Sequence, residues 1–592
     1  MTDENTKTAA LPSFNLIDEP WIPVLMQDGN SQVLSLKDTF AQAPNISQIV
    51  AELPTTSVAI EAVLQAILRR ALPDYYPEDG QDPKQYREAV MDAVKEYWFD
   101  WDPVRGHVED YLDEWADCFD LFDPKRPFFQ VGNLEAAKGE PAGLAILMAD
   151  VPSGHPFLTM RRAEGLDAID FAEAARWVVH AQAYDPSGIR GAAVGDKRAT
   201  GGRVYPIGPG WTARFGAFAP RTGSLAHDLL LSAAPSGIGH LSFDPEEDLP
   251  AWEREVATER PQGIGDQEWE SLSVKQLRDL RRLPSGPSDV LTWQTRRIRL
   301  IAEDDKVTGV ILANGDPLDP QNRQTVEPRA AWRYSKPQST KFKIETYMPK
   351  EFTEGSSLWR GTESLFPQAV TTLRPNKQTE VVAFYGPAIS DWIAHLGGSN
   401  ALGRRELNGI TFEVVGMVLG SNMSVVDDII TDSLTLPVAL LQEENRQYRV
   451  EVEDWVQRAE RVASAVGGFA ADLQRAAGAD NTDEVFAEAK GTFLANARIR
   501  FLETLSQLEV GDWAATENLG NHWTNELRKL AWQQRTDLLR DIGEAALQGS
   551  ESGGRYVTAG SAEMFFGRRL AQILGTAPGK PTDQQTKEGT DA

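Results

Sequence analysis

The segment from Asp185 to Arg203 is dense in glycine, in small residues and in Lys and Arg. Glycine lets a backbone approach a ligand closely, and cationic side chains pair with phosphate. A long connection of this composition is either a functional loop or a disordered one. The combination favours contact with a nucleic-acid groove; the alternative is a flexible surface loop that carries ordinary charges.

No sequence motif brings together side chains that could catalyse a reaction. Asp18-Glu19 and Asp427-Asp428 are adjacent acids, but a two-metal nuclease needs further ligands that converge on one site. The seven histidines follow no metal-binding spacing, no GxSxG nucleophile motif occurs, and one cysteine, Cys118, excludes disulfide frameworks and cysteine-rich zinc sites. We predict no catalytic residue, no metal and no cofactor. A metal-dependent nuclease is kept as an alternative.

Cationic residues are clustered more clearly. Alternation from Trp293 to Leu300 predicts a strand with Arg297 and Arg299 on one face and apolar residues on the other. Such a face would suit a phosphate backbone, and Lys197 and Arg198 of the glycine-rich segment would add to it. The alternative is a set of surface ion pairs, for which an acidic chain has many partners.

The elements that must position these residues change character along the chain. A turn at Asp28-Gly29 predicts a β-hairpin near the amino terminus, and apolar spacing predicts several helices after it. The predicted hairpin strands are 14–26 and 31–35, the helices are 51–72, 86–98 and 108–119, and the later strands are 290–301, 306–312 and 411–418. This order predicts a large mixed α+β domain over residues 1–440.

The carboxy-terminal part has a helical pattern throughout. Apolar residues recur every three to four positions in four stretches, 452–473, 481–505, 523–545 and 561–573. Short connections without a predicted strand favour a four-helix bundle over residues 446–575. Residues 576–592 are polar and are predicted to be disordered.

Charge and hydropathy narrow the class of protein further. The 592 residues include 59 Lys and Arg against 87 Asp and Glu, a net charge of −28. This balance argues against a protein that coats nucleic acid nonspecifically, so any phosphate contact must be local. No apolar run is long enough to span a membrane, and no signal peptide is recognisable; we expect a cytoplasmic protein.

Two short segments resemble a known family. The run Asn15-Leu-Ile-Asp-Glu-Pro-Trp-Ile-Pro-Val24 is similar to the amino-terminal signature of CasA, the large subunit of the type I-E CRISPR Cascade surveillance complex. Arg126-Pro-Phe-Phe-Gln130 resembles the segment that follows it. The resemblance implies a noncatalytic subunit that recognises the protospacer-adjacent motif (PAM) on double-stranded DNA, helps to open the duplex and recruits a helicase-nuclease. Its implied partners are guide RNA and the other Cascade subunits.

The resemblance also assigns sites. The family's glycine loop, which approaches the PAM from the minor groove, corresponds to Gly188, Ile189, Arg190, Gly191, Ala192 and Ala193. The wedge beside the first base pair corresponds to a turn containing Ser421 and Asn422. The loop that anchors the subunit to guide RNA falls at Phe157, Leu158 and Thr159, of which only the phenylalanine matches the family.

Other family sites carry over less directly. The minor-groove lysine has no clear counterpart, which leaves Asn322, Arg323 and Lys336 as candidates. In the bundle, Arg498, Arg528 and Arg535 are expected to contact DNA backbone, because a cationic track holds single strands without reading them. The alternative within the family is an architectural or recruiting subunit that does not read the PAM.

Overall fold

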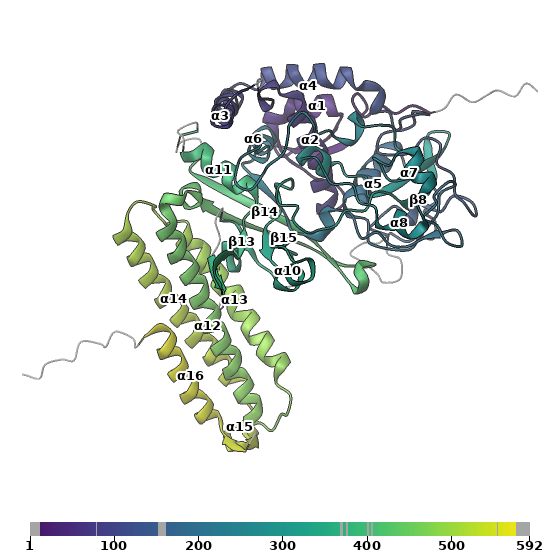
Figure 1. Cartoon of the computed structure of the whole chain (residues 1–592). Coiled ribbons are helices and arrows are strands. Elements are labelled where there is room, and N and C mark those ends of the chain that lie inside the picture. Colours follow the sequence, from purple (N-terminus) through teal and green to yellow (C-terminus); the bar gives the residue numbers. More distant parts are fainter. Residues whose placement is uncertain are drawn as a thin grey trace, which may run out of the picture. The chain divides into compact units, whose positions relative to one another are not determined.

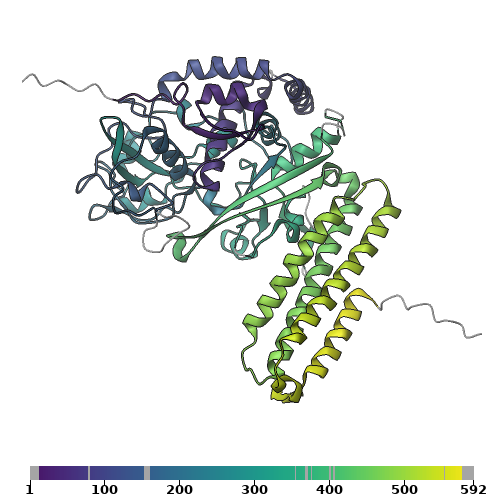
Figure 2. The ribbon, with the colours of Figure 1, turned by 180° about the vertical axis from the view of Figure 1, so that it is seen from behind.

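The structure is a computed structural model that describes residues 12–77, 80–151, 161–353, 355–366, 371–374, 377–398, 402–403, 407–552 and 554–575. The chain divides into two compact units, Met1–Leu434 and Thr435–Ala592 (Figures 1 and 2). Unit 1 mixes helices with strands, and unit 2 is mainly helical. The predicted fold class is therefore confirmed. In the ranges described, no helix is both long enough and apolar enough to cross a membrane.

Unit 1 is built around one buried helix, α2 (Pro54–Ala71). Proline near its first turn has no N–H to leave unpaired, and every residue from Thr55 to Arg69 except Ser57 is buried. The guanidinium of Arg69 donates to the carbonyls of Ser232 and Ala234 at 3.2 and 2.9 Å. The other helices of unit 1 are α1 (Leu36–Gln42), α3 (Pro83–Phe99), α4 (Asp102–Glu114), α5 (Phe171–Tyr184), α6 (Leu225–Ser232), α7 (Asp266–Ser271), α8 (Val274–Asp279), α9 (Pro287–Leu291), α10 (Lys336–Phe342) and α11 (Ala388–Gly398).

The strands of unit 1 form small separate sheets, and the last strand, β15, continues a few residues past Leu434. Their orders are β2-β1-β3, β15-β14-β6, β10-β9-β13, β7-β8, β11-β12 and β4-β5. The strands are β1 (Ile22–Met26), β2 (Ser31–Leu34), β3 (Ile46–Ile49), β4 (Arg190–Gly191), β5 (Arg203–Val204), β6 (Ala217–Arg221), β7 (Arg296–Glu303), β8 (Lys306–Asn314), β9 (Trp332–Tyr334), β10 (Tyr347–Pro349), β11 (Thr371–Arg374), β12 (Lys377–Val382), β13 (Phe384–Tyr385), β14 (Gly409–Leu419) and β15 (Val426–Pro437).

The predicted strands are confirmed in part. The amino-terminal hairpin is present, with Ile22 opposite Leu34, although its first strand begins at Ile22. The predicted strand 290–301 is wrong at its start, because Pro287–Leu291 is the helix α9 and β7 begins at Arg296. The Asp248 carboxylate accepts hydrogen bonds from the first amides of α9 at 2.8 and 3.0 Å, and this capping favours a helix there.

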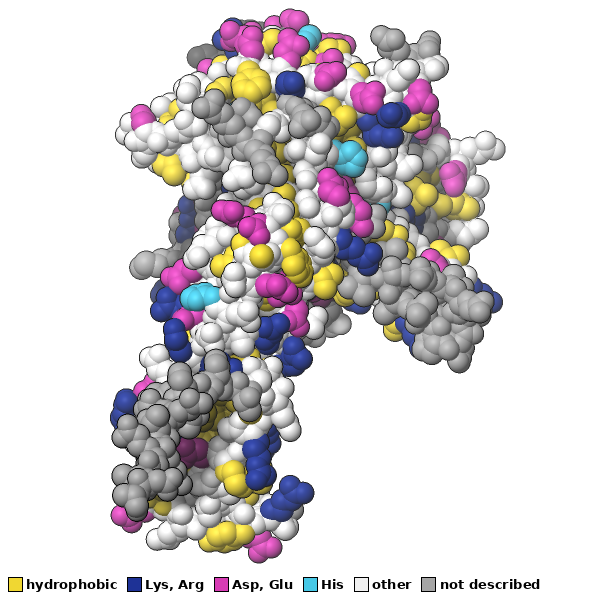
Figure 3. All heavy atoms as spheres, turned by 90° about the vertical axis from the view of Figure 1, so that its left-hand side faces the viewer, with side chains coloured by type: hydrophobic (Ala, Val, Ile, Leu, Met, Phe, Trp, Pro, Cys, Tyr) yellow, Lys and Arg dark blue, Asp and Glu magenta, His cyan; other side chains and the backbone are white. Residues whose placement is uncertain are grey.

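Helices α3 and α4 carry an acidic surface. Their outward residues include many Asp and Glu, and Figure 3 shows acidic side chains gathered at the top of that view. The inner residues, among them Val90, Val94, Val104 and Val108, are fully buried. These helices therefore combine an apolar inner face with a strongly negative outer one.

One arginine joins four elements of unit 1. Arg221 on β6 lies 2.9 Å from Glu61 of α2 and 2.7 Å from Glu413 of β14, with Asp228 of α6 at 3.8 Å. Three carboxylates around one guanidinium leave excess negative charge in a buried place. Burial is the main cause that raises the pKa of Asp228 to about 7, and it also raises the pKa of Glu61.

This cluster predicts a pH dependence of stability. Between the ordinary Asp value of 3.8 and about 7, folded protein retains a proton on Asp228 that unfolded chain has lost. Asp228 therefore reduces stability as pH rises through this window, by at most about 1.4 kcal/mol per pH unit. We expect Asp228→Asn to unfold at higher urea than the wild type at pH 8, with the difference shrinking toward pH 5. An unchanged difference between these pH values would contradict the prediction.

Unit 2 is a four-helix bundle made of α12 (Arg446–Ala476), α13 (Asp483–Leu505), α14 (Trp513–Arg540) and α16 (Ala559–Leu574). Helix α12 packs against each of the other three. The indole of Trp523 is fully buried and donates to the carbonyl of Trp455 at 2.9 Å. The expectation of no strand is wrong, since α15 (Glu544–Gln548) and the hairpin of β16 (Ser550–Ser552) and β17 (Arg555–Val557) lie between α14 and α16.

Candidate nucleic-acid interface

The structure brings together the two segments predicted to contact DNA at the PAM. The backbone N–H of Ser187, at the start of the glycine-rich loop, donates to the carbonyl of Met423 at 2.8 Å. Met423 belongs to the tip of the hairpin formed by β14 and β15. Both segments lie in unit 1, so their juxtaposition is a property of one compact body.

The hairpin tip is held in an unusual backbone conformation. Asn422 and Met423 both have left-handed backbones, with φ of 58° and 55°. The N–H of Gly420 donates to Val425 at 2.9 Å, and the N–H of Met423 donates to Gly420 at the same distance. Ser421 and Asn422 are exposed, and the Met423 side chain is 39% exposed. The turn thus presents two polar residues and one apolar side chain to solvent.

The glycine loop presents small residues beside this tip. A Cβ added to Gly188 would meet only the Arg190 side chain, at 3.8 Å, and one added to Gly191 would meet nothing within 4 Å. Ile189 between them is 57% exposed. Because open space surrounds these positions, glycine is not required there by packing within the chain.

A buried carboxylate fixes the shape of the loop. Asp185 accepts from the guanidinium of Arg190 at 2.6 Å and from that of Arg296 at 2.5 Å. Arg296 is buried and also donates to the carbonyls of Pro186 and Gly208, at 2.9 and 3.1 Å. Charge-assisted hydrogen bonds of this kind are strong and directional. The loop is therefore anchored to β7 on one side and to the hairpin tip on the other.

The last two residues of the predicted loop site do not reach solvent. Ala192 and Ala193 are 4% and 3% exposed. The Ala192 carbonyl accepts from the N–H of Ala137 at 2.8 Å, and Ala193 packs in an apolar cluster that includes Leu134 and Ala313. Their methyl groups belong to the core, so the expectation that they enter a DNA groove is corrected.

A cavity lies between the loop and the hairpin. It has a volume of about 320 Å³ and is lined by both segments, including Gly188 and Arg190 on one side and Ser424 and Val425 on the other. Met148 and neighbouring apolar residues line its inner wall. The surface at the junction is therefore hollowed, with apolar walls and the Arg190–Asp185 ion pair at one edge.

Two predicted phosphate contacts are internal. Arg297 is 1% exposed and donates to Asp316 at 2.7 Å and to three carbonyls. Arg198 is 2% exposed, binds Asp196 through two nitrogens, and donates to the carbonyls of Asn314 and Gly315. Strand alternation predicted a cationic face but could not show that other segments cover it. The prediction that these two residues contact phosphate is therefore wrong, and both stabilise the fold.

The other two predicted contacts in unit 1 are partly engaged. Arg299 is half-buried and donates to the carbonyl of Leu134 at 3.0 Å. The Lys197 side chain is 37% exposed and forms an ion pair with Glu270. An exposed ion pair contributes little to stability, so Lys197 can exchange this partner for a phosphate.

The structure shows a cationic surface around α10. Of its residues, only Lys336 was a candidate from the sequence. Residues 328–344 contain five Lys and Arg and no acid, in a chain of net charge −28. Lys336, Lys341 and Lys343 on and after α10 are exposed, and none forms an ion pair with a described residue. Phe342 and Ile344 beside them are 41% and 59% exposed. The absence of acids was the signal that could have revealed this surface.

These lysines predict a change in salt dependence. Each phosphate contact contributes about 0.9 to the slope of log affinity against log salt concentration. We expect Lys336→Ala, Lys341→Ala and Lys343→Ala together to reduce that slope by up to ~2.7 when the assembled complex binds duplex DNA. The control is Lys95→Ala on the acidic α3 surface. An equal slope in the triple variant and the wild type would contradict the prediction.

The cations predicted in the bundle lie mostly around α14. Arg528 donates to the carbonyl of Leu574 at the end of α16, at 2.8 Å. Arg535 pairs with Glu563 and lies over the ring of Trp532, which is 41% exposed. Arg498 on α13 is half-buried. Exposed aromatic rings next to Arg are suited to stacking with unpaired bases.

The anchor residues predicted from the resemblance, Phe157, Leu158 and Thr159, lie outside the described residues.

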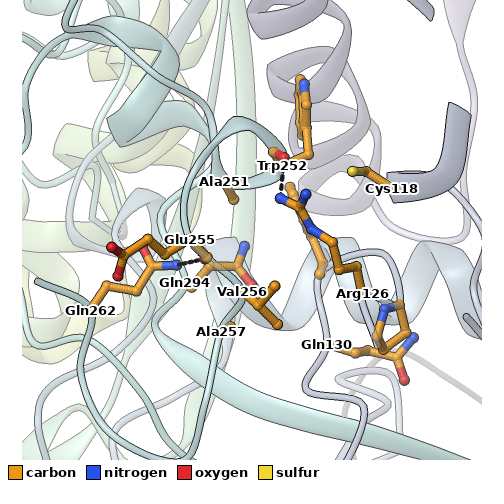
Figure 4. A pocket seen from close by; sticks show the side chains of 12 residues that line it. Cys118, Arg126, Gln130, Ala251, Trp252, Glu255, Val256, Ala257, Gln262 and Gln294 are labelled. Carbon is orange, nitrogen blue, oxygen red and sulfur yellow. Dashed lines mark hydrogen bonds between the residues drawn. The ribbon is translucent and has the colours of Figure 1, made fainter. Parts of the chain in front are cut away.

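The segment Arg126–Gln130 lines a small cavity of about 40 Å³ near Trp252 and Cys118 (Figure 4). There Arg126 donates to the carbonyls of Trp252 and Arg254, both at 2.9 Å, and burial raises the pKa of the Cys118 thiol. This segment holds neighbouring loops together.

The acids considered for a nuclease are not assembled into a metal site. Asp427 lies beside Gly420 in the hairpin, whereas Asp18 and Glu19 precede β1. Across the part of the chain that the structure describes, no group of three or more His, Cys, Asp or Glu is placed to hold a metal ion.

Comparisons with known proteins agree with the resemblance seen in the sequence. The sequence profile of the CRISPR-associated protein Cse1 family matches residues 15–534. CRISPR-associated protein CasA/Cse1 of Thermus thermophilus is 27% identical over 475 residues, which is 78% of this chain and 80% of that protein.

Solved structures share the fold. Thermobifida fusca Cse1 is 34% identical, with a TM-score of 0.81 over 95% of this chain and 98% of that one. A chain of a CRISPR RNA-guided surveillance complex, 16% identical, has a TM-score of 0.60 over 89% of this chain and 100% of that one. The profile covers most of the sequence, and the chain therefore belongs to the Cse1 (CasA) family of CRISPR-associated proteins.

Proposed function

We propose that this chain is the large, noncatalytic subunit of an RNA-guided CRISPR surveillance complex that recognises the PAM on double-stranded DNA. It would bind the minor groove with the glycine loop, help to open the duplex with the hairpin tip and recruit a helicase-nuclease that cleaves the target. Its other partners would be guide RNA and the remaining subunits, in the cytoplasm. The observation that carries this proposal is the Ser187–Met423 hydrogen bond, which joins the loop to the tip.

Two open glycines in the loop suit contact with a minor groove. That groove is about 6 Å wide, so backbone and small residues enter it more easily than large side chains. Gly188 and Gly191 have open space around them. A·T and T·A pairs look alike in this groove, and we therefore expect more than one PAM sequence to be accepted.

The hairpin tip has a suitable position for strand separation. Inserting an apolar side chain between base steps costs a few kcal/mol of unstacking, which is offset by new protein contacts. Met423 is an exposed apolar side chain next to Asn422, and its backbone carbonyl accepts a hydrogen bond from Ser187 of the loop. Duplex opening would then begin beside the groove contact, and guide pairing would extend it at nearly balanced free energy.

The test is duplex binding by the guide-loaded complex, reconstituted with and without this chain. The targets share one guide-matched sequence and differ only at the PAM. We expect the chain to raise affinity for some PAMs and not for others. If affinity for every target is the same with and without it, the chain is an architectural or recruiting subunit, and the loop assignment is wrong.

A further inference from the structure

A groove on unit 2 has no part in the DNA contacts proposed above. It runs between α13 and α14 and has a volume of about 430 Å³. Apolar residues from both helices line it, and Ile499 among them is 58% exposed. Its lining includes Val485, Ala489 and Ile499 of α13 and Leu530, Gln534 and Leu538 of α14.

The groove arises because α13 has apolar residues on more than one side. Phe493, Ala497 and Phe501 are fully buried, whereas Val485 and Ile499 line the groove. A helix of a closed bundle needs only one apolar stripe. The extra apolar surface of α13 is therefore available to something outside the bundle.

The floor of the groove contains an unpaired hydrogen-bond acceptor. The side-chain amide of Gln534 donates to the backbone carbonyl of Ala489 at 2.8 Å and so bridges the two helices. Its Oε1 atom is inaccessible to solvent and has no hydrogen-bond partner. A donor from a partner cannot reach an atom that solvent cannot reach, so the role of Gln534 is to hold α13 and α14 together at the floor of the groove.

Charge at the groove is negative. Glu488 and Asp541 line it, are exposed, and form no ion pair with any described residue. The one cation that lines it, Arg500, is matched by Glu503 at 2.9 Å and Glu526 at 3.9 Å. An acidic groove repels phosphate and favours a cationic ligand.

We propose that this groove binds an amphipathic helix of a protein partner, with apolar residues on one face and Lys or Arg on its flanks. Helix-in-groove binding uses apolar anchors at positions i, i+3, i+4 and i+7. The groove extends from Val485 to Ile499 along α13, which at 1.5 Å per residue is about 21 Å. A helix of roughly 14 residues fills that length.

The proposal gives α14 two different faces. Arg528, Trp532 and Arg535 lie on one side of this helix, and Leu530, Gln534 and Leu538 contribute to the groove. The first face is cationic and aromatic, and the second is acidic and apolar. One helix would therefore separate a nucleic-acid surface from a protein-docking surface, and loss of one need not affect the other.

The first experiment uses the full chain and a synthetic probe. The probe is a 14-residue helical peptide with leucines on one face and lysines on both flanks, and its binding is followed by fluorescence anisotropy. We expect it to bind at least tenfold more tightly than a peptide with glutamates in place of the lysines, or one with alanines in place of the leucines. Ile499→Glu and the pair Glu488→Lys, Asp541→Lys should each weaken binding about tenfold.

The control is Trp532→Ala on the opposite face, which should leave peptide binding unchanged. Thermal unfolding by circular dichroism establishes that each variant folds. If the groove variants bind the lysine peptide as the wild type does, its attraction is general to an acidic chain and the proposal is overturned.

The second experiment locates the occupant in the assembled complex. A photo-crosslinking amino acid is placed at Gln533, which lines the groove, and the crosslinked peptides are identified by mass spectrometry. A cationic helical segment of another subunit or of the nuclease supports the proposal. Crosslinks only to nucleic acid, only to another copy of this chain, or to nothing overturn it. The experiment rests on the proposed function for the assembled complex itself, but its readout does not depend on PAM recognition, so PAM recognition can fail while this proposal holds.

Discussion

The double substitution Gly188→Trp, Gly191→Trp is expected to lower the affinity of the guide-loaded complex for a PAM-bearing duplex by about 100-fold. Tenfold in affinity corresponds to about 1.4 kcal/mol, so this is a loss of about 2.8 kcal/mol. An indole at either position is too large for a groove about 6 Å wide. Neither position is crowded at Cβ, since one added to Gly191 meets nothing within 4 Å and one added to Gly188 meets only the Arg190 side chain, at 3.8 Å. Binding of a guide-complementary single strand distinguishes loss of the DNA contact from misfolding.

The matched control is Gly188→Ala, Gly191→Ala, which adds two methyl groups. Because a methyl group still fits the narrow groove, affinity should stay within about threefold of the wild type. A second control is a guide-complementary single strand, which needs no PAM recognition. We expect the tryptophan variant to bind this strand as the wild type does. Equal losses of affinity for duplex and single strand would show an assembly defect. No loss of affinity for either would contradict the prediction that the loop enters the minor groove.

Much of the fold could be predicted because its signals are local. The apolar stripe of α12, from Val452 to Leu473, records one helical face of a long bundle member. The turn at Asp28-Gly29 records a hairpin whose strands pair as expected. Such patterns need no knowledge of distant residues. The local pattern gave the wrong element where a residue far along the chain determines the structure. The prediction of a strand at 290 was wrong because Asp248 caps the helix α9 there.

Accessibility could not be predicted in the same way. Alternation in β7 separates Arg297 from Ile298, but both are buried, because Asp316 and the carbonyls of Thr258 and Arg260 cover the arginine. A strand covered on both faces loses the simple rule that charged residues face solvent. Arg297 was therefore assigned to a surface that other loops occupy.

The joining of the loop and the hairpin tip also lay beyond local patterns. Ser187 and Met423 are far apart in the chain, and no residue type marks a backbone-to-backbone bond in advance. The glycines of the loop could be recognised from composition, and the left-handed residues at the tip could not. Family resemblance supplied both segments, and the structure shows that they adjoin.

Asp185 provides the prediction with the largest effect on stability. Asp185→Asn removes the negative charge that faces Arg190 and the fully buried guanidinium of Arg296. Breaking a buried ion pair in this way leaves an uncompensated charge and costs about 3–5 kcal/mol. We expect the free energy of unfolding, measured by urea denaturation of the full chain, to fall by that amount. Amide hydrogen exchange in residues 186–191 should accelerate, because the carboxylate anchors that loop.

Arg190→Met distinguishes the contribution of Arg190 to stability from that of Arg296, the other partner of the Asp185 carboxylate. Arg190 is only half-buried, so its removal leaves the Asp185–Arg296 pair intact and should cost about 1 kcal/mol. If Asp185→Asn costs no more than Arg190→Met, the buried pair does not fix the loop. If it costs several times more, and PAM-dependent duplex affinity falls with it, a residue that is itself buried controls DNA binding by holding Gly188 and Gly191 against the hairpin tip. The same variant should leave the bundle groove and its lysine-peptide affinity unchanged, since the two sites lie in separate compact units.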